Sequence, residues 1–221
     1  MRVLFVGDGP HDVGRDVESM GAPFEGVVQM LARRLCPHIA KDSPARHWKT
    51  IPLFSTKREH VVSRKLKAAA LVAERTYDCA ALVAVIDRDN DDARTAALRD
   101  ACAQVHAPEL PVVGGVAVNS IEAWTLGAPT ALASALGVTP GQLTKKYQPG
   151  RVEALYQNSD EAAKRPKDLL MRLAQEFAHR PDGIQLRQEV AALTDVTELE
   201  RHCPGGFAPF AAALRERLPP T

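Results

Sequence analysis

The chain has 221 residues, of which 45% are hydrophobic and 25% are charged, a composition that excludes a disordered or fibrous protein. The 28 Lys and Arg residues almost balance the 27 Asp and Glu residues, so the formal net charge is +1. A protein that binds a polyanion over its whole surface is usually more basic. Any contact with nucleic acid is therefore expected to use a local basic patch.

The N-terminal sequence and the cysteines predict a cytoplasmic protein without membrane contacts. The apolar run in MRVLFVGDG is too short for a signal peptide, and no stretch approaches the ~20 apolar residues that span a bilayer. Cys36, Cys79, Cys102 and Cys203 are scattered and form no CxxC motif. In a chain of this size, such cysteines are expected to be reduced thiols.

Strands and helices are predicted to alternate in the first half of the chain. The best-defined strand is Ala80–Ile86, since this continuously apolar run is typical of a strand buried on both faces of a parallel sheet. Alternating strands and helices predict an α/β fold with a parallel sheet flanked by helices. The predicted elements are strands over Arg2–Val6, Trp48–Phe54, Ala80–Ile86 and Pro111–Val118, and helices from about Asp12 to Leu35 with an interruption near Gly21-Ala22-Pro23, over Lys57–Arg75, from Asp91 or Asp92 to about Val105, and over Ser120–Leu126.

The second half of the chain is predicted to be helical. No further convincing strand is found, and we expect residues 1–127 to form the α/β core and residues 128–221 a helical appendage. The final helix is expected to pack back on the core. The predicted helices of this part are Thr130–Leu136, Pro140–Lys146, Arg151–Leu155, Pro166–Phe177, Leu186–Leu199 and Phe207–Leu218.

Acidic residues follow the predicted strands at one edge of the sheet. Ligands of open parallel sheets bind beyond the carboxyl ends of the strands. Carboxylates gathered there repel each other unless a cation neutralises them, and oxygen ligands without nearby His or Cys suit Mg²⁺ or Mn²⁺. The sequence therefore predicts a metal site formed by Asp8, Asp87 and Asp89, with Asp12 and Glu122 as supporting acids.

Each of these acids also has a structural interpretation. Asp8 lies in a Gly-Asp-Gly-Pro sequence typical of turns, and Asp12 and Glu122 could complement a helix dipole in the first turn of a helix. Asp91 and Asp92 are expected to cap a helix rather than bind metal. A calcium loop beginning at Asp87 is disfavoured because the loop lacks its glycine and its final acid.

Five short segments resemble a small bacterial family of the Toprim type. The resemblance implies a Toprim-like sheet, a general acid/base or metal-ligand role for Asp8, and divalent metal ions held by Asp87 and Asp89. Asp8 stands where the family usually has Glu, and its side chain is one methylene shorter. The segments are Val6-Gly7-Asp8-Gly9-Pro10-His11-Asp12, Val85-Ile86-Asp87-Arg88-Asp89, Asn119-Ser120-Ile121-Glu122-Ala123-Trp124, Lys164-Arg165-Pro166-Lys167 and Cys203-Pro204-Gly205-Gly206-Phe207.

Two groups of basic residues are candidates for binding nucleic acid, because phosphates require cations near the acidic edge. A solvated helix face is the alternative interpretation of each group. The candidates are Lys57, Arg58, Arg64 and Lys65 in the first group, and Lys164 and Lys167 in the second.

The leading functional hypothesis is metal-dependent hydrolysis of phosphodiester bonds in DNA or RNA by a Toprim-type nuclease that requires Mg²⁺ or Mn²⁺. By resemblance, such a nuclease acts in defence against phage. The expected partners are DNA or RNA, a partner ATPase encoded nearby and a second copy of the chain in a homodimer. A non-catalytic Toprim-like subunit that binds nucleic acid or an ATPase is the alternative, favoured by Asp8 in place of Glu. A small-molecule phosphohydrolase that uses the same acids is a third hypothesis.

Overall fold

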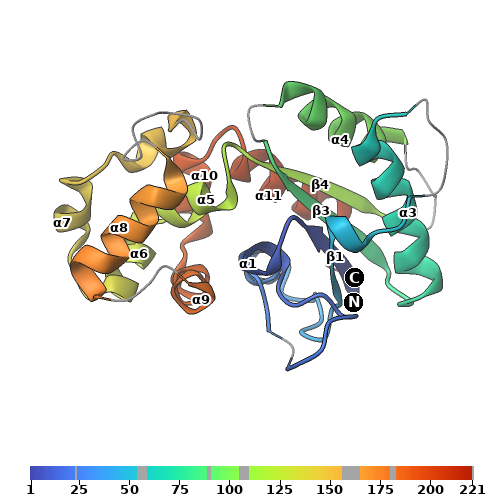
Figure 1. The fold of residues 1–221 in the computed structure, drawn as a ribbon, viewed down its shortest axis with the longest axis horizontal. Helices are drawn as coiled ribbons and strands as arrows, with labels where there is room; N and C mark the ends of the chain where they lie inside the picture. Colours follow the sequence, from blue (N-terminus) through green and yellow to red (C-terminus); the bar gives the residue numbers. More distant parts are fainter. Residues whose placement is uncertain are drawn as a thin grey trace. The chain divides into compact units, whose positions relative to one another are not determined.

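A computed structural model describes residues 1–22, 24–53, 59–88, 91–104, 110–155, 165–179 and 183–220. The chain divides into two compact units (Figure 1). The first unit comprises residues 1–86, 91–116 and 210–221, and the second comprises residues 87–90 and 117–209. The first unit is therefore built from three separate segments of the sequence, and each unit is considered by itself below.

The first unit contains a four-stranded parallel sheet in the order β2-β1-β3-β4, which confirms the predicted α/β fold. Phe5 of β1 lies opposite Ala45 of β2, and Leu4 lies opposite Leu82 of β3. Helices flank the sheet (Figure 1). The strands are β1 (Val3–Gly7), β2 (Ala45–His47), β3 (Ala81–Asp87) and β4 (Val112–Ala117), of which only Asp87 and Ala117 belong to the second unit.

Helices α3 (Val61–Arg75) and α4 (Asp92–Gln104) cover one face of this sheet. Leu66 of α3 and Leu98 of α4 share a buried apolar cluster with Leu4 of β1 and Leu82 of β3. In each strand, the residues next to these leucines point to the other face of the sheet. Each strand in this layer is thus connected to the next by a helix, as expected for parallel strands.

The last helix, α11 (Phe207–Arg217), contributes to the first unit from Phe210 onward. A Cβ atom at Gly115 of β4 would lie 2.7 Å from the Phe210 ring, so only glycine leaves room for this ring. The Arg217 guanidinium donates to the Val112 carbonyl at 2.7 Å, and the Cys36 thiol at the end of α2 (Val27–Leu35) donates to the Leu214 carbonyl. The C-terminal segment is therefore part of the first unit's core.

The second unit is helical, and none of its described residues after Ala117 lies in a strand. The ring of Trp124 meets that of Phe207 edge to face at 5.2 Å. No described helix of the protein has the length and apolar character needed to cross a membrane. The elements are α5 (Ile121–Leu126), α6 (Pro129–Leu136), α7 (Pro140–Thr144), a 3-10 helix (Pro149–Ala154), α8 (Pro166–Ala178), α9 (Ile184–Leu193) and α10 (Val196–His202).

The predicted strand over Trp48–Phe54 is wrong. The strand β2 ends at His47, and Trp48–Thr50 form a 3-10 helix. The Trp48 indole donates to the Val85 carbonyl at 2.8 Å, an interaction with a distant strand that fixes this turn. Phe54 lies outside the described residues.

The helix from about Asp12 to Leu35 is interrupted as predicted, but over a longer stretch than Gly21-Ala22-Pro23: its described residues form α1 (Pro10–Val13) and α2 with a non-helical segment between them. Gly14 has a φ of +84°, and a Cβ atom at Gly26 would lie 2.3 Å from the Gly14 nitrogen. Leu186–Leu199 is divided between α9 and α10. The division occurs where the Asp195 carboxylate accepts the Thr197 N–H and begins a new helix.

Candidate functional site

A polar hollow of about 420 Å³ in the second unit brings together three residues singled out in the sequence, Asp87, Glu122 and Lys167. The other side chains that line it come from Ser120 and from the start of α8, with Arg165, Pro166 and Asp168. The segment after β3, the start of α5 and the start of α8 therefore meet at one place. The lining residues span 81 positions of the sequence, from Asp87 to Asp168.

Asp87 ends β3, and its Oδ1 accepts the Ile121 N–H at 3.0 Å. This hydrogen bond ties the carboxylate to the first turn of α5. Asn119 has a φ of +67°, a left-handed conformation that Asn tolerates better than most residues. The turn at Asn119 leads the chain from β4 into α5 and places Ser120 beside Asp87.

Ser120 precedes α5 and is only 3% exposed. Its Oγ lines the hollow beside the Glu122 carboxylate, and the hydroxyl helps to lower the pKa of Glu122. Ser120 therefore adds a polar group to the wall of the hollow that a bound ligand can contact.

Glu122 forms an ion pair with Arg187 of α9 at 2.9 Å, and their side chains are 9% and 2% exposed. Burial raises the pKa of Glu122, but the Arg187 guanidinium and the nearby Ser120 hydroxyl outweigh burial and hold this pKa below its ordinary value. Glu122 is therefore ionised at neutral pH. Its carboxylate lies at the wall of the hollow, where Arg187 balances its charge.

The N-terminal turn of α8 supplies the positive side of the hollow. The first N–H groups of a helix have no partner within the helix, and the helix dipole favours an anion at this end. Arg165 and Lys167 add two cationic side chains, and Asp168 pairs with Arg165 at 2.5 Å. The hollow thus combines carboxylates with an anion-binding helix end, which suits a cation together with a phosphate.

Asp8 follows β1 in the first unit, where Arg94 of α4 neutralises it. The Arg94 Nη2 donates to both carboxylate oxygens of Asp8, at 2.8 and 2.9 Å. Lys65 is also near this pair and donates to the Trp48 carbonyl. Burial lowers the pKa of Lys65, the Asp8 charge opposes this shift, and the Arg94 charge adds to it.

Asp12 is buried in the first turn of α1 and has a capping role. Its Oδ2 accepts the Gly9 N–H at 2.9 Å, which closes the Gly-Asp-Gly-Pro turn after β1.

Arg64 of α3 is partly buried, and its Nε has no hydrogen-bond partner among the described residues. Asp12 and Arg64 both belong to the first unit.

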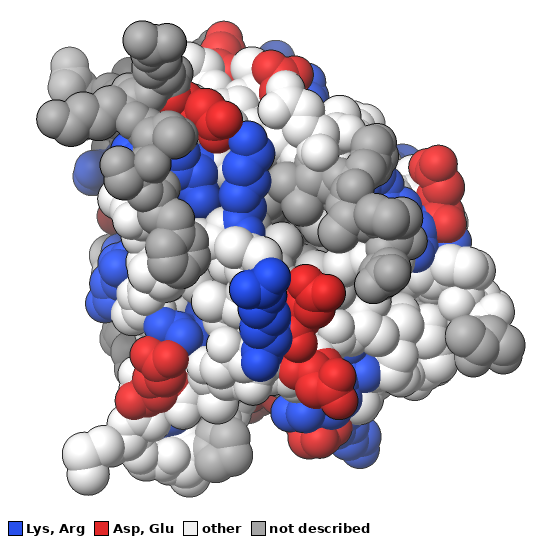
Figure 2. All heavy atoms as spheres, turned by 90° about the vertical axis from the view of Figure 1, so that its right-hand side faces the viewer, with Lys and Arg blue, Asp and Glu red and all other residues white. Residues whose placement is uncertain are grey.

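Four of the predicted site residues, Lys57, Arg58, Asp89 and Lys164, lie outside the described residues. Within the described part of the chain, no three His, Cys, Asp or Glu side chains gather as a complete metal site. On the face drawn in Figure 2, the described acidic and basic side chains are interspersed rather than collected into one basic field. The described cations on this face form no extended basic field.

Sequence reasoning did not single out Arg94, Arg187 or Ser120 as functional residues. Ser120 and Arg165 lie inside the motifs Asn119-Ser120-Ile121-Glu122-Ala123-Trp124 and Lys164-Arg165-Pro166-Lys167, so these motifs were a usable signal for both residues. Arg94 and Arg187 lie on helices without a motif, and only the folded chain brings them to Asp8 and Glu122.

No family model matches the chain. No curated protein and no solved structure matches it.

Proposed function

We propose that this protein is a Mg²⁺- or Mn²⁺-dependent enzyme that hydrolyses phosphodiester bonds in nucleic acid. The observation that carries the proposal is the hollow that is lined by both the Asp87 carboxylate and the cationic start of α8. Metal-assisted phosphoryl transfer needs both a carboxylate ligand for the cation and a positive partner for the phosphate.

Asp87 and Asp89 are proposed to hold the metal, and Asp8 is proposed as a further ligand or as the general acid/base. Asp8 follows β1 and Asp87 ends the neighbouring parallel strand β3, and ligands of parallel sheets bind beyond such strand ends. The resemblance of these segments to Toprim motifs supports the same assignment. A bound divalent ion would polarise the phosphate and lower the pKa of the attacking water.

The remaining residues of the hollow are proposed to position the substrate. Lys167, Arg165 and the first N–H groups of α8 would hold the phosphate oxygens. The buried Ser120 Oγ would donate a hydrogen bond to the same group. Glu122, held in place by Arg187, would present a carboxylate oxygen at the cation-binding side of the hollow.

The test is cleavage of labelled single-stranded DNA, double-stranded DNA and RNA with Mg²⁺ or Mn²⁺. We expect Asp87→Ala to reduce cleavage by at least about 100-fold, because the residue binds the catalytic cation. Asp100→Ala, which alters an exposed acid of α4, is the matched control and should cleave like the wild type. Cleavage that survives in Asp87→Ala would refute this site.

A non-catalytic, nucleic-acid-binding subunit is the second candidate, and the Asp8–Arg94 contact favours it. Asp8 is already neutralised by Arg94 and is shorter than the Glu typical of Toprim motifs. On this hypothesis, the protein slows the migration of nucleic acid in a gel when no metal is added, and the nucleic acid is not cleaved. Micromolar Mn²⁺ binding in calorimetry that is lost in Asp87→Asn would exclude this candidate.

A further inference from the structure

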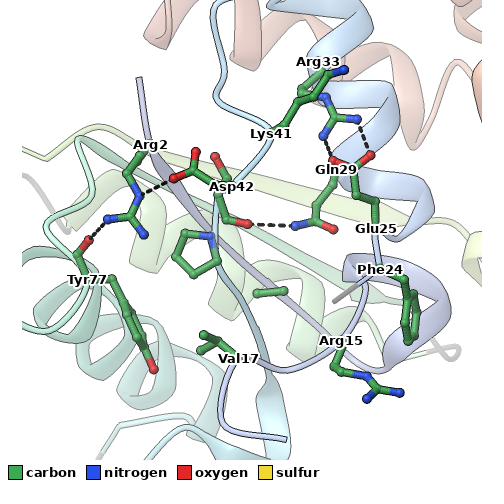
Figure 3. A pocket seen from close by; sticks show the side chains of 13 residues that line it. Arg2, Arg15, Val17, Phe24, Glu25, Gln29, Arg33, Lys41, Asp42 and Tyr77 are labelled. Carbon is green, nitrogen blue, oxygen red and sulfur yellow. Dashed lines mark hydrogen bonds and ion pairs between the residues drawn. The ribbon is translucent and has the colours of Figure 1, made fainter. Parts of the chain in front are cut away.

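A second cavity, of about 530 Å³, lies in the first unit at the opposite end of the strands from Asp8 (Figure 3). Its walls include Arg2, which precedes β1, and Ala45, which begins β2, whereas Asp8 follows β1. The segment around Val17 closes it from outside the sheet, where the Val17 N–H donates to the Ala45 carbonyl at 2.9 Å. This volume is within the range of about 300–1,000 Å³ that is usual for small-molecule sites.

The walls of the cavity are mainly apolar. Figure 3 shows Phe24 and Tyr77 on opposite sides of the hollow, with Val17 between them. The Val17 side chain is 48% exposed although it faces the cavity. Covering such a side chain with an apolar ligand group is favourable by about 25 cal/mol for each Å² removed from water.

The polar groups of the cavity carry a surplus of positive charge. Its cations are Arg2, Arg15, Arg33 and Lys41, and its acids are Glu25 and Asp42. Asp42 lies 3.5 Å from Arg2, and Glu25 pairs with Arg33, which leaves two positive charges uncompensated within the lining.

The two cations of the lining without an acidic partner there are Arg15 and Lys41. Arg15 donates to the Met20 carbonyl, and its guanidinium lies over the Phe24 ring, 5.5 Å from the ring centroid. Lys41 is exposed and makes no ion pair with any described residue. An anionic group on a ligand would therefore find Lys41 available.

The floor of the cavity is already ordered. The buried Gln29 side chain accepts the Gly26 N–H at 3.0 Å and donates to the Ser43 carbonyl at 3.2 Å. These hydrogen bonds fix α2 against the segment that leads into β2. A ligand would thus enter a site whose shape requires little rearrangement, which favours affinity.

We propose that this cavity is a binding site for a small organic anion with an apolar body. The body lies between Phe24 and Tyr77 and covers Val17, and the anionic group pairs with Lys41. A mononucleotide and a medium-chain carboxylate share this chemistry. The site is separate from the hollow at Asp87, so it does not depend on the proposed hydrolysis.

The test is calorimetric titration of the full chain with three probes: anilinonaphthalene sulfonate, adenosine monophosphate and decanoate. We expect at least one probe to bind with a dissociation constant below about 1 mM. Lys41→Glu, which reverses the unpaired charge, and Val17→Trp, which fills the cavity, should each weaken binding about tenfold or more. The probe that binds identifies the source of the anion.

Lys49→Glu is the matched control, since Lys49 is an exposed lysine outside the cavity and should leave binding unchanged. Thermal unfolding of each variant shows that the fold is retained. Val17→Trp should also keep the wild-type cleavage activity, which separates this test from that of the proposed function. The inference is overturned if no probe binds, or if Lys41→Glu and Val17→Trp bind as the wild type does.

Discussion

Arg94 contacts both carboxylate oxygens of Asp8 through one nitrogen, at 2.8 and 2.9 Å. The guanidinium therefore neutralises the acid that we propose as a further metal ligand. A metal ion that binds Asp8 must displace this internal cation. The Asp8–Arg94 pair thus competes with metal binding and lowers the affinity of the site.

Arg94→Ala is expected to tighten Mn²⁺ binding by about three- to fivefold, since a partly exposed pair contributes up to about 1 kcal/mol. Calorimetry measures this change. Arg99→Ala, an exposed substitution on the same helix, should leave the affinity unchanged. Unchanged or weaker binding in Arg94→Ala would remove Asp8 from the proposed ligand set.

Lys167→Ala is expected to weaken binding of the nucleic-acid substrate about tenfold, because the residue adds a cation to the anion-binding end of α8. The slope of binding against salt concentration should also fall by about one phosphate contact. Fluorescence anisotropy at several salt concentrations measures both quantities. Lys145→Ala changes an exposed lysine elsewhere in the second unit, and an equal effect there would contradict a specific phosphate contact.

Glu122→Gln is expected to lower the free energy of unfolding by about 3–5 kcal/mol, because it removes the carboxylate charge from a buried ion pair with Arg187. Replacing both residues, as Glu122→Leu with Arg187→Met, should cost less than the single substitution. Urea unfolding compares the three proteins. A single variant as stable as the wild type would show that the pair contributes little.

The same pair predicts a dependence of stability on acid. The pKa of Glu122 is lower in the folded chain than its ordinary value, so its contribution is present above about pH 4.3, the ordinary pKa of glutamate, and is lost as the pH falls through the folded pKa. Unfolding measured between neutral and acidic pH should show a smaller acid-induced loss in Glu122→Gln than in the wild type.

Asp16→Asn is expected to destabilise the protein by about 3 kcal/mol, because Asp16 is 1% exposed and joins the segment before α2 to β2. Its carboxylate accepts the His47 N–H at 2.9 Å and the Thr50 hydroxyl at 2.6 Å. Thermal unfolding measures the effect. Asp42→Asn, at an exposed acid, should change stability by less than about 0.5 kcal/mol, and a similar loss in both variants would argue against the Asp16 network.

The strand β3 could be predicted from sequence because a continuous apolar run specifies its own burial. The strand β2 could not, since its three residues Ala45–His47 include Arg and His, and they are buried by distant partners such as Asp16. Similarly, the turn at Trp48 depends on the Val85 carbonyl. Local patterns do not contain these long-range hydrogen bonds.

In the candidate site, too, local patterns predict some residues but not their long-range partners. Asp87, Glu122 and Lys167 could be singled out because strand ends and short motifs mark them, and they line one hollow. The counter-charges Arg94 and Arg187 could not, because each lies on an amphipathic or mixed helix with nothing local to distinguish it from a solvated cation. An ion pair between distant segments is visible only in the folded chain.

The contact between Phe210 and Gly115 has a consequence for biosynthesis. The sheet's layer is completed by a helix whose residues are made after the whole of residues 117–209. While the chain emerges from the ribosome, the second unit has nearly all of its residues before the first unit can bury Val85 and Gly115 beneath Phe210. Folding of the first unit therefore cannot finish until residue 210 and the helix around it have been made, and a nascent chain that stops short of residue 210 leaves an apolar sheet face open to chaperones.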